Sequence, residues 1–261
     1  MYTEQFAQLA QRSQSGDKRA LLQLLRLAHT PVSFQCRKML RNDQAAEALI
    51  HQILAAVPNQ LNSLPDPVDF EKWICRITAS RCMQALSRMH RDTPDDIAPP
   101  GTPPVISATT LDQNQTAQLV QQLVDDLPEE PRICLLLYSC ASLKLKGIAQ
   151  LTGFPESEVL EHLNHAQKAV NTQLRKYHRM GVHFTAIPAL SSLLRTAMYN
   201  SQDPKAAAAV VSSILSKKPA PPSTPIWKRF SGNKRMLIAV ISAAVLLVLM
   251  LAVILYLEFA H

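Results

Sequence analysis

Residues 143–174, LKLKGIAQLTGFPESEVLEHLNHAQKAVNTQL, have the residue spacing of a helix-turn-helix unit. Ala149 is small enough to let the first helix pack closely, Gly153 supplies the turn, and Val159 seats the second helix on the first. Pro155 suits the start of the second helix, because its missing N–H group would have no helical partner there. The second helix of such a unit can enter the major groove of DNA. Its apolar face is formed by residues spaced three and four apart: Val159, Leu163, Ala166 and Val170.

The composition predicts an all-α protein. The 261 residues include only 6 glycines and 5% aromatic residues, whereas the helix formers Gln, Ala and Leu are abundant. The net charge is +7, and the basic side chains in residues 1–91 could attract nucleic acid. The five cysteines show neither CxxC nor Cys/His metal spacing, so we expect buried free thiols.

The chain divides into two small helical domains joined by a flexible linker, followed by a tail. Residues 1–91 form the first domain, and the acidic, Pro-rich stretch 92–112 is the linker. The second domain spans 113–180 and contains the helix-turn-helix. The tail consists of accessory helices in 181–216, a basic Pro-rich linker over 217–235 and a membrane span over 236–257.

Hydrophobic periodicity and helix-breaking residues predict the individual helices. In the first domain we expect a break near Ser15 and Gly16, and Asp43 as the N-cap of a helix. The predicted segments there are a helical region 3–29, helices 32–40 and 44–57, a loop at Pro58, Pro65 and Pro67, and a helix opening at 69–73. Further along they are helices 113–127, 132–142, 189–199 and 204–216, with a turn at 128–131.

Residues 236–257 contain no charged side chain. As a helix these 22 residues would span about 33 Å, enough for the hydrocarbon core of a bilayer. A buried core helix is the alternative, but such a helix is rarely so long and apolar on every side. Lys228, Arg229, Lys234 and Arg235 precede the stretch. The positive-inside rule therefore predicts a single-pass cell-membrane protein with the residues before 236 in the cytoplasm.

No catalytic constellation is visible in the sequence. It contains no glycine-rich phosphate loop, HExxH, GxSxG or clustered acid pair. We therefore expect no enzyme activity and no cofactor. His162 and His165 lie three residues apart, but no further metal ligand is close in sequence, so polar residues facing DNA are favoured over a metal pair.

The domain order resembles the extracytoplasmic-function group of sigma-70 family RNA polymerase sigma factors, over roughly residues 8–180. Each matching segment is short, but their order and spacing together are fairly specific. The segments are SGDKRALLQLL (15–25), AAEALIHQIL (45–54), DFEKWICRITASRCMQAL (69–86) and the stretch from LVDDLPEEPR through the helix-turn-helix (123–170).

This resemblance implies a function and a set of site residues. The first domain would bind core RNA polymerase and open the downstream promoter element, and the second would read the upstream element. The polymerase-binding helix would carry Glu47, Leu49 and Gln52. The downstream-element helix would carry Trp73, Arg76, Ser80, Arg81 and Gln84, with Arg88 on the same polar face. The upstream-element helix would carry Ser157, Glu158, Glu161, His162, His165 and Lys168.

Several positions depart from the family pattern. Ala48 and Gln52 stand where acids usually meet the polymerase, and Glu161 stands where a small or basic residue is usual. Each missing base removes a phosphate contact. Three hypotheses therefore remain: a membrane-tethered sigma factor, a degenerate sigma-like regulator that binds polymerase or a partner without initiating, and a membrane-anchored DNA-binding regulator. A membrane regulator or a protease would be a further partner if the tether transmits a signal.

Overall fold

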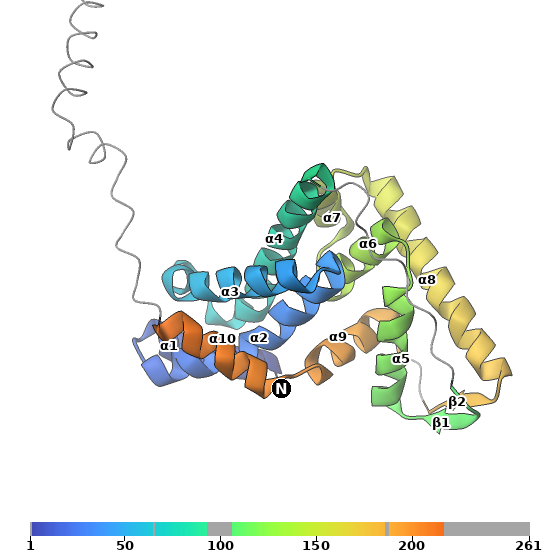
Figure 1. Cartoon of the computed structure of the whole chain (residues 1–261), viewed down its shortest axis with the longest axis horizontal. Coiled ribbons are helices and arrows are strands. Elements are labelled where there is room, and N and C mark those ends of the chain that lie inside the picture. Colours follow the sequence, from blue (N-terminus) through green and yellow to red (C-terminus); the bar gives the residue numbers. More distant parts are fainter. Residues whose placement is uncertain (1, 65, 93–105, 186–187, 217–261) are drawn as a thin grey trace, which may run out of the picture. The chain divides into compact units, whose positions relative to one another are not determined.

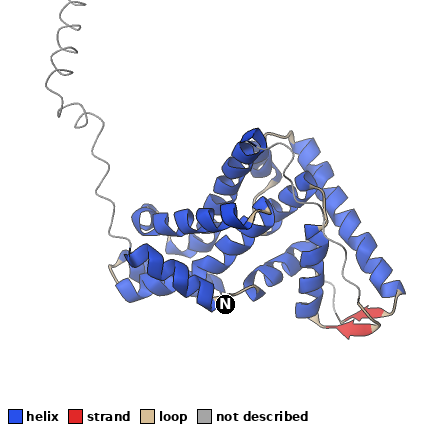
Figure 2. Cartoon of the chain, viewed as in Figure 1, coloured by secondary structure: helices blue, strands red, loops and turns tan. Residues whose placement is uncertain are grey.

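The computed structural model describes residues 2–64, 66–92, 106–185 and 188–216. The described part is almost entirely helical, which confirms the all-α expectation, and only two short strands accompany the helices (Figure 2). Residues 1–215 form one compact unit. The α-helices are α1 (Tyr2–Gln14), α2 (Lys18–Leu40), α3 (Asp43–Gln60), α4 (Phe70–Asp92), α5 (Gln113–Asp125), α6 (Glu129–Ser139), α7 (Leu145–Thr152), α8 (Glu156–Arg179), α9 (Leu190–Asn200) and α10 (Pro204–Ser216) (Figure 1).

The break between the first two helices lies where the sequence predicts it. Gly16 adopts φ +90°, a left-handed conformation that suits glycine. The carboxylate of Asp17 then accepts hydrogen bonds from the N–H groups of Arg19 and Ala20, which caps α2. This capping favours Lys18 as the first residue of α2.

The prediction of a separate helix over 32–40 is wrong. Helix α2 continues through Pro31 to Leu40 without interruption. A proline inside a helix removes one hydrogen bond and crowds the preceding turn. Here Pro31 and its neighbours Ala28 and Val32 are buried, so tertiary packing keeps the two segments in one helix.

Other predicted boundaries in the first four helices also require correction. Asn42, not Asp43, is the N-cap of α3, because its side chain accepts the N–H of Ala45 at 2.9 Å. Pro58 lies inside α3 and does not begin the loop. Two short 3-10 turns, Leu61–Ser63 and Pro67–Asp69, then lead into α4.

Helix α6 begins earlier than predicted. It starts at Glu129 rather than at Arg132, and it ends at Ser139. Pro131 is tolerated there because the first turn of a helix has no intrahelical partner for its N–H groups. Helix α5 carries the expected start, since Asp112 and Gln115 form a reciprocal capping box.

Two strands were not predicted from the sequence. Strand β1 (Thr109–Leu111) pairs in parallel with β2 (Val182–Phe184). Residues 109–111, which belong to the predicted linker, are thus hydrogen-bonded to β2, the strand that follows α8 in the chain. Gly181, at φ +88°, lies beside this pair, and a Cβ atom there would approach the Cβ of Ala108 to 3.0 Å. Glycine is therefore the residue that fits this close approach.

The accessory helices fold back onto the rest of the unit. Helix α9 packs against α5, α6 and α2, and Figure 1 shows it between α2 and α5. Helix α10 has the bounds predicted from the sequence. The helices of the described residues include none with both the length and the apolar character needed to cross a bilayer. The predicted linker 217–235 and span 236–257 lie outside the described residues.

All five cysteines are buried and free, as expected. Cys36 on α2 and Cys82 on α4 are in contact, with 3.7 Å between their sulfur atoms. Burial raises the pKa of the Cys75 thiol to about 12. Such thiols remain protonated and act as small apolar side chains in the core.

Candidate nucleic-acid interface

The helix-turn-helix has the geometry that its sequence predicts. Helix α7 ends at Thr152, and Gly153 caps it. The φ of +82° at Gly153 turns the chain, and its N–H donates to the carbonyl of Ala149 at 2.9 Å. Helix α8 follows after Pro155, whose carbonyl accepts the N–H of Val159. Ile148 and Val159 are fully buried and join the two helices.

Helix α8 presents a polar face that starts at its N-terminal end. Its apolar face is buried through Val159, Ala166 and Val170, whereas Leu163 is half-buried. The predicted DNA-facing residues divide into two groups. Ser157, Glu161, His165 and Lys168 are exposed, and Glu158 and His162 are half-buried.

His162 packs into the helix-turn-helix instead of projecting freely. Its ring lies 5.2 Å from the ring of Phe154 between centroids. Its Nε2 atom is 3.6 Å from a Glu158 carboxylate oxygen, too long for a hydrogen bond, and it has no hydrogen-bond partner in the structure. His162 therefore supports the start of α8, and His165 is the histidine of the pair that solvent reaches.

The charge of the α8 face changes along the helix. Glu156 and Glu161 are exposed in the first two turns, together with the half-buried Glu158. Basic side chains appear only further on, from Lys168 to the end of the helix. The N-terminal end, which a recognition helix directs at base edges, is therefore acidic.

Helix α4 presents a cationic face. Arg76, Arg81 and Arg88 are exposed and have no hydrogen-bond or ion-pair partner among the described residues. Gln84 is exposed on the same face, and Ser80 is half-buried. The buried side of α4 explains this orientation, because Phe70, Ile74, Ala79, Cys82 and Leu86 lie in the core.

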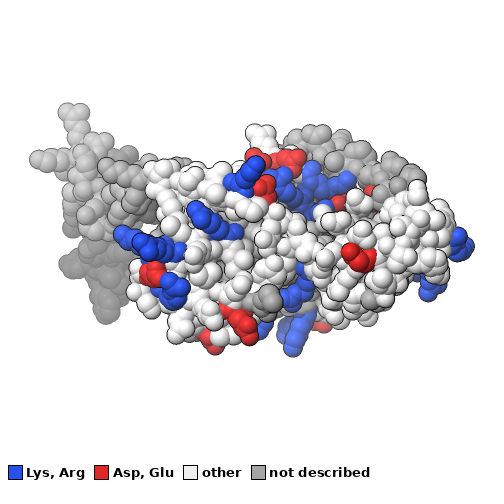
Figure 3. Space-filling model, turned by 90° about the horizontal axis from the view of Figure 1, so that it is seen from below, with Lys and Arg blue, Asp and Glu red and all other residues white. Residues whose placement is uncertain are grey.

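Trp73 is half-buried at the start of this face, and its ring packs against Phe70 at 5.5 Å between centroids. The structure thus brings all six predicted residues of α4 to one side of the helix. On the face that Figure 3 shows, Lys and Arg side chains stand in small groups separated by broad uncharged areas.

The predicted polymerase-binding residues differ in exposure. On α3, Gln52 is exposed, and the exposed Glu47 lies 3.4 Å from a guanidinium nitrogen of Arg37. Leu49 is only 9% exposed and belongs to the core. Leu49 therefore fixes α3 to its neighbours and offers little surface to a partner.

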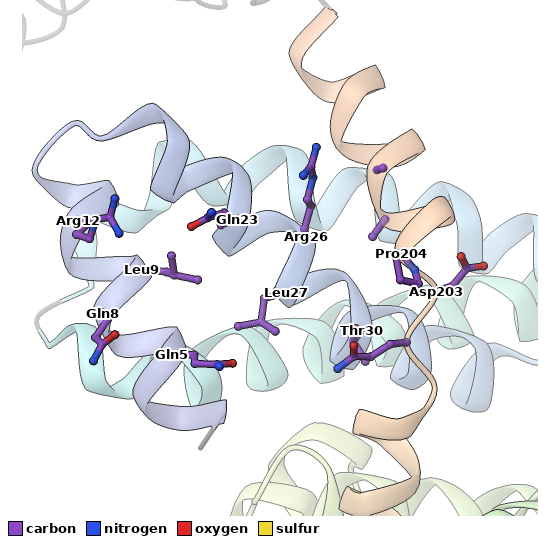
Figure 4. Close-up of a pocket in the computed structure, with 13 residues that line it drawn as sticks. Gln5, Gln8, Leu9, Arg12, Gln23, Arg26, Leu27, Thr30, Asp203 and Pro204 are labelled. Carbon is purple, nitrogen blue, oxygen red and sulfur yellow. The ribbon is translucent and has the colours of Figure 1, made fainter.

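The hollows of the described surface carry no visible catalytic arrangement. One of about 630 Å³ lies between α1, α2 and the start of α10 (Figure 4). Gln, Arg and Leu side chains line much of it, with Asp203 and Pro204 on the α10 side. Within the described ranges, no three His, Cys, Asp or Glu side chains gather as metal ligands.

Sequence reasoning missed two buried charged residues. Glu71 on α4 is 5% exposed, and Arg132 on α6 is 2% exposed. Burial lowers the pKa of Arg132 to about 10, and its Nε and Nη1 atoms have no hydrogen-bond partner. The sequence contains one indication that Glu71 is buried, because this residue stands beside Phe70 at the start of an apolar helix face. A buried charge there needs a partner.

Comparisons with known proteins leave the family open. No family model matches the chain. Part of the chain is similar to the pantothenate kinases of Shewanella sediminis (strain HAW-EB3) and Shewanella woodyi (strain ATCC 51908 / MS32), each 39% identical over 67 residues. The match covers 23% of this chain and 21% of each kinase, so the chain spans about a fifth of the length of these curated relatives. A match of this extent shows neither the family nor an activity.

Proposed function

We propose that this protein is a membrane-tethered sigma factor of the extracytoplasmic-function type, which directs core RNA polymerase to specific promoters. The observation that carries the proposal is the exposed face of α4. Arg76, Arg81 and Arg88 are unpaired among the described residues and surround Gln84, with Trp73 at one end. Arginines in this state can bind phosphates, and each neutralised phosphate releases counterions.

The helix-turn-helix supports the same proposal. The fully buried Ile148 and Val159 join α7 to α8. This packing leaves Ser157, His165 and Lys168 exposed on α8. In the proposed role α4 opens the downstream promoter element, and α8 reads the upstream one. The exposed surface of α3 around Glu47 and Gln52 meets the polymerase.

The tether is proposed from the sequence. The uncharged stretch 236–257 follows a basic segment, which favours a single span with the helical unit on the cytoplasmic side. Under this proposal the protein acts at the cell membrane, and a membrane regulator or protease is the partner that changes its state.

A second candidate is a sigma-like regulator that binds polymerase or a partner without initiating transcription. The acidic start of α8 favours it. Glu156, Glu158 and Glu161 precede the first basic residue of that helix, and acids near DNA phosphates oppose binding. A plain membrane-anchored DNA-binding regulator is the third candidate, and it would need no polymerase.

A mobility-shift experiment separates the three candidates. Residues 1–216 would be mixed with DNA from upstream of the protein's own gene, with and without core RNA polymerase of the source organism. The fragment has to extend to 216, because Leu193 and Met198 of α9 and Val211 of α10 are buried in the unit and a fragment ending at 180 would lack them. A sigma factor produces a specific shift only with polymerase. Polymerase binding without a specific DNA shift supports the second candidate, and a specific shift without polymerase supports the third.

A further inference from the structure

A buried carboxylate links the two ends of the described chain. Glu71 on α4 accepts hydrogen bonds from Thr3 Oγ1 at 2.6 Å, from Arg195 Nη2 at 2.8 Å and from Tyr199 OH at 2.5 Å. Arg195 and Tyr199 both lie on α9. Burial raises the pKa of Tyr199 above its usual range, so its hydroxyl group remains a donor. The ring of Tyr199 also stacks on Tyr2 of α1, with 4.3 Å between centroids.

Helix α9 also holds the helices on its other side. We refer to α1–α4 as the N-terminal group and to α5–α8 as the C-terminal group. Helix α9 packs extensively on α5 and α6 of the C-terminal group. Asn200 donates to Asn114 at the start of α5 at 3.0 Å. Arg195 joins both groups by itself, because its Nη1 atom lies 3.5 Å from Ser142 Oγ while its Nη2 atom bonds Glu71. The apolar residues of α9 are buried: Leu193, Leu194, Ala197 and Met198.

We propose that α9 is an intramolecular clasp, which holds the N-terminal and C-terminal groups in one closed unit and releases the N-terminal group at Glu71 when it opens. The direction of opening follows from chemistry. At Glu71 the N-terminal group is held through polar atoms of Arg195 and Tyr199, and α9 also packs on α2. The packing of α9 on α5 and α6 is more extensive, which favours retention of α9 there.

A polar attachment of this kind suits a joint that separates. Removing one partner from a buried ion pair is costly, because the other charge stays buried and uncompensated. If the whole joint opens, however, the buried Glu71 and Tyr199 reach water, as the partly exposed Arg195 already does in part, and hydration replaces the bonds that they lose. An apolar joint of the same area gains nothing comparable from water.

The two groups also touch each other directly, since α2 packs on α6 and α4 packs on α7. Arg41 donates to the carbonyl of Asp125 at 3.3 Å. Lys38 pairs with Asp125 at 2.5 Å, and His90 Nε2 lies 3.1 Å from Glu129. Both pairs are partly exposed, with side-chain exposures between 17% and 45%. Pairs of this kind contribute little to stability, so α9 holds the unit closed together with the direct packing of α2 on α6 and of α4 on α7.

Opening would change the distance between the two faces proposed to meet DNA. Residues 93–108 connect the groups in the chain, and 16 residues of any sequence span at most about 55 Å. The exposed residues of α4 and α8 could then adopt the separation that two promoter elements require, a consequence that rests on the proposed function. Helix α10 follows α9 in the chain and is followed by residues 217–261, so cleavage or tension in that tail would act on α10 and, through it, on the clasp.

Distance measurement between two spin labels tests the clasp. The labels would be attached at Ala48→Cys on α3 and Asn171→Cys on α8, which are exposed, while the five native cysteines are buried. In the full chain in detergent we expect one narrow distance distribution. Arg195→Ala/Tyr199→Phe should add a population that is longer by on the order of 10 Å or more, within the reach of the connecting residues.

Matched variants give the controls. Arg175→Ala/Tyr138→Phe makes the same chemical changes at exposed residues and should leave the distribution unchanged. Tyr199→Phe alone keeps the ring stack and removes one hydroxyl group, so it provides a folded variant if the double variant fails to fold, and it should open a smaller fraction. An unchanged distribution in a folded Arg195→Ala/Tyr199→Phe or Tyr199→Phe variant would overturn the clasp. Equal opening by Lys38→Met would overturn the assignment of closure to α9.

The clasp and the proposed function fail in different ways. If the labels separate but polymerase does not bind, the clasp stands and the sigma-factor proposal fails. If polymerase binds and the label distance is the same in all folded variants, the sigma-factor proposal stands and the clasp is wrong.

Discussion

Helices α4 and α8 are the two long helices proposed to face DNA, and their exposed faces differ in the distribution of charge. On α4 the face is cationic through Arg76, Arg81 and Arg88. On α8 the first two turns are acidic, and Lys168 is the first base of that helix. Both helices bury an apolar side in the core, so packing does not require the difference in exposed charge. We relate that difference to how each helix would meet DNA. In the proposed role α4 provides most of the electrostatic attraction to DNA, and α8 contributes through its fit in the groove.

The largest effect is expected from removing the cationic face of α4. In the complex with core polymerase, Arg76→Ala/Arg81→Ala/Arg88→Ala should weaken promoter DNA binding roughly 500-fold at 0.1 M salt, because three phosphate contacts are lost. The slope of log K against log salt should become shallower by about 2.7. Fluorescence anisotropy titrations at several salt concentrations measure both quantities.

The control for this triple variant removes the same number of positive charges from another helix, α2. Lys18→Ala/Arg19→Ala/Arg26→Ala removes three exposed bases from α2. We expect this variant to bind DNA nearly as well as the wild type. An equal loss in both variants would mean that net charge, and not the α4 face, determines binding.

The second prediction breaks the helix-turn-helix at its turn. Gly153 has φ +82°, so Gly153→Ala should lower the free energy of unfolding by about 1–2 kcal/mol, the cost of a left-handed conformation for an L-residue. Urea unfolding of residues 1–216 measures this change. Gly147→Ala is the control, because Gly147 lies within α7 and has ordinary space for a side chain, with 3.5 Å between the new Cβ atom and Leu143 Cδ2. The free energy of unfolding of this variant should stay equal or rise by about 0.5–1 kcal/mol. Equal losses in both variants would contradict the observed turn.

The third prediction concerns contact between α8 and DNA. Glu161→Lys replaces an exposed acid by a base, and one added phosphate contact should tighten DNA binding about eightfold at 0.1 M salt. The matched variant Glu4→Lys changes an exposed acid on α1 and should have little effect. If both variants bind like the wild type, α8 does not approach the phosphates, which would favour the non-initiating regulator.

The smallest effect concerns the pH dependence of stability and the buried His29 of α2. Burial lowers the pKa of His29 from its ordinary value of 6.5, so the unfolded chain binds a proton more readily than the folded one. The stabilising effect of neutral His29 is therefore complete above pH 6.5 and decreases as the pH falls below that value. We expect His29→Gln to flatten the dependence of unfolding free energy on pH. An unaltered pH dependence in His29→Gln would contradict this assignment.

The sequence predicts the local parts of this molecule well. The period of Val159, Ala166 and Val170 gave the buried face of α8, and Gly153 gave the turn, because both depend on neighbours within a few residues. The arginines of α4 were also identified correctly as exposed, since the apolar positions of that helix left one polar side.

Features that depend on distant residues were missed. Helix α2 passes through Pro31 because tertiary burial outweighs the local preference of proline. Strand β1 forms only because β2 lies beside it, 73 residues later in the register Thr109 to Val182. The bonds of Glu71 to Arg195 and Tyr199 join positions more than 120 residues apart. No local pattern encodes that partnership.

Transcription from promoter DNA tests the central proposal most directly. Core RNA polymerase, residues 1–216 and DNA from upstream of the protein's own gene would be combined, and run-off transcripts would be measured. The proposal predicts transcripts that start at one position, require the protein and are lost with Arg76→Ala/Arg81→Ala/Arg88→Ala. Polymerase that binds the protein but produces no specific transcript would contradict it.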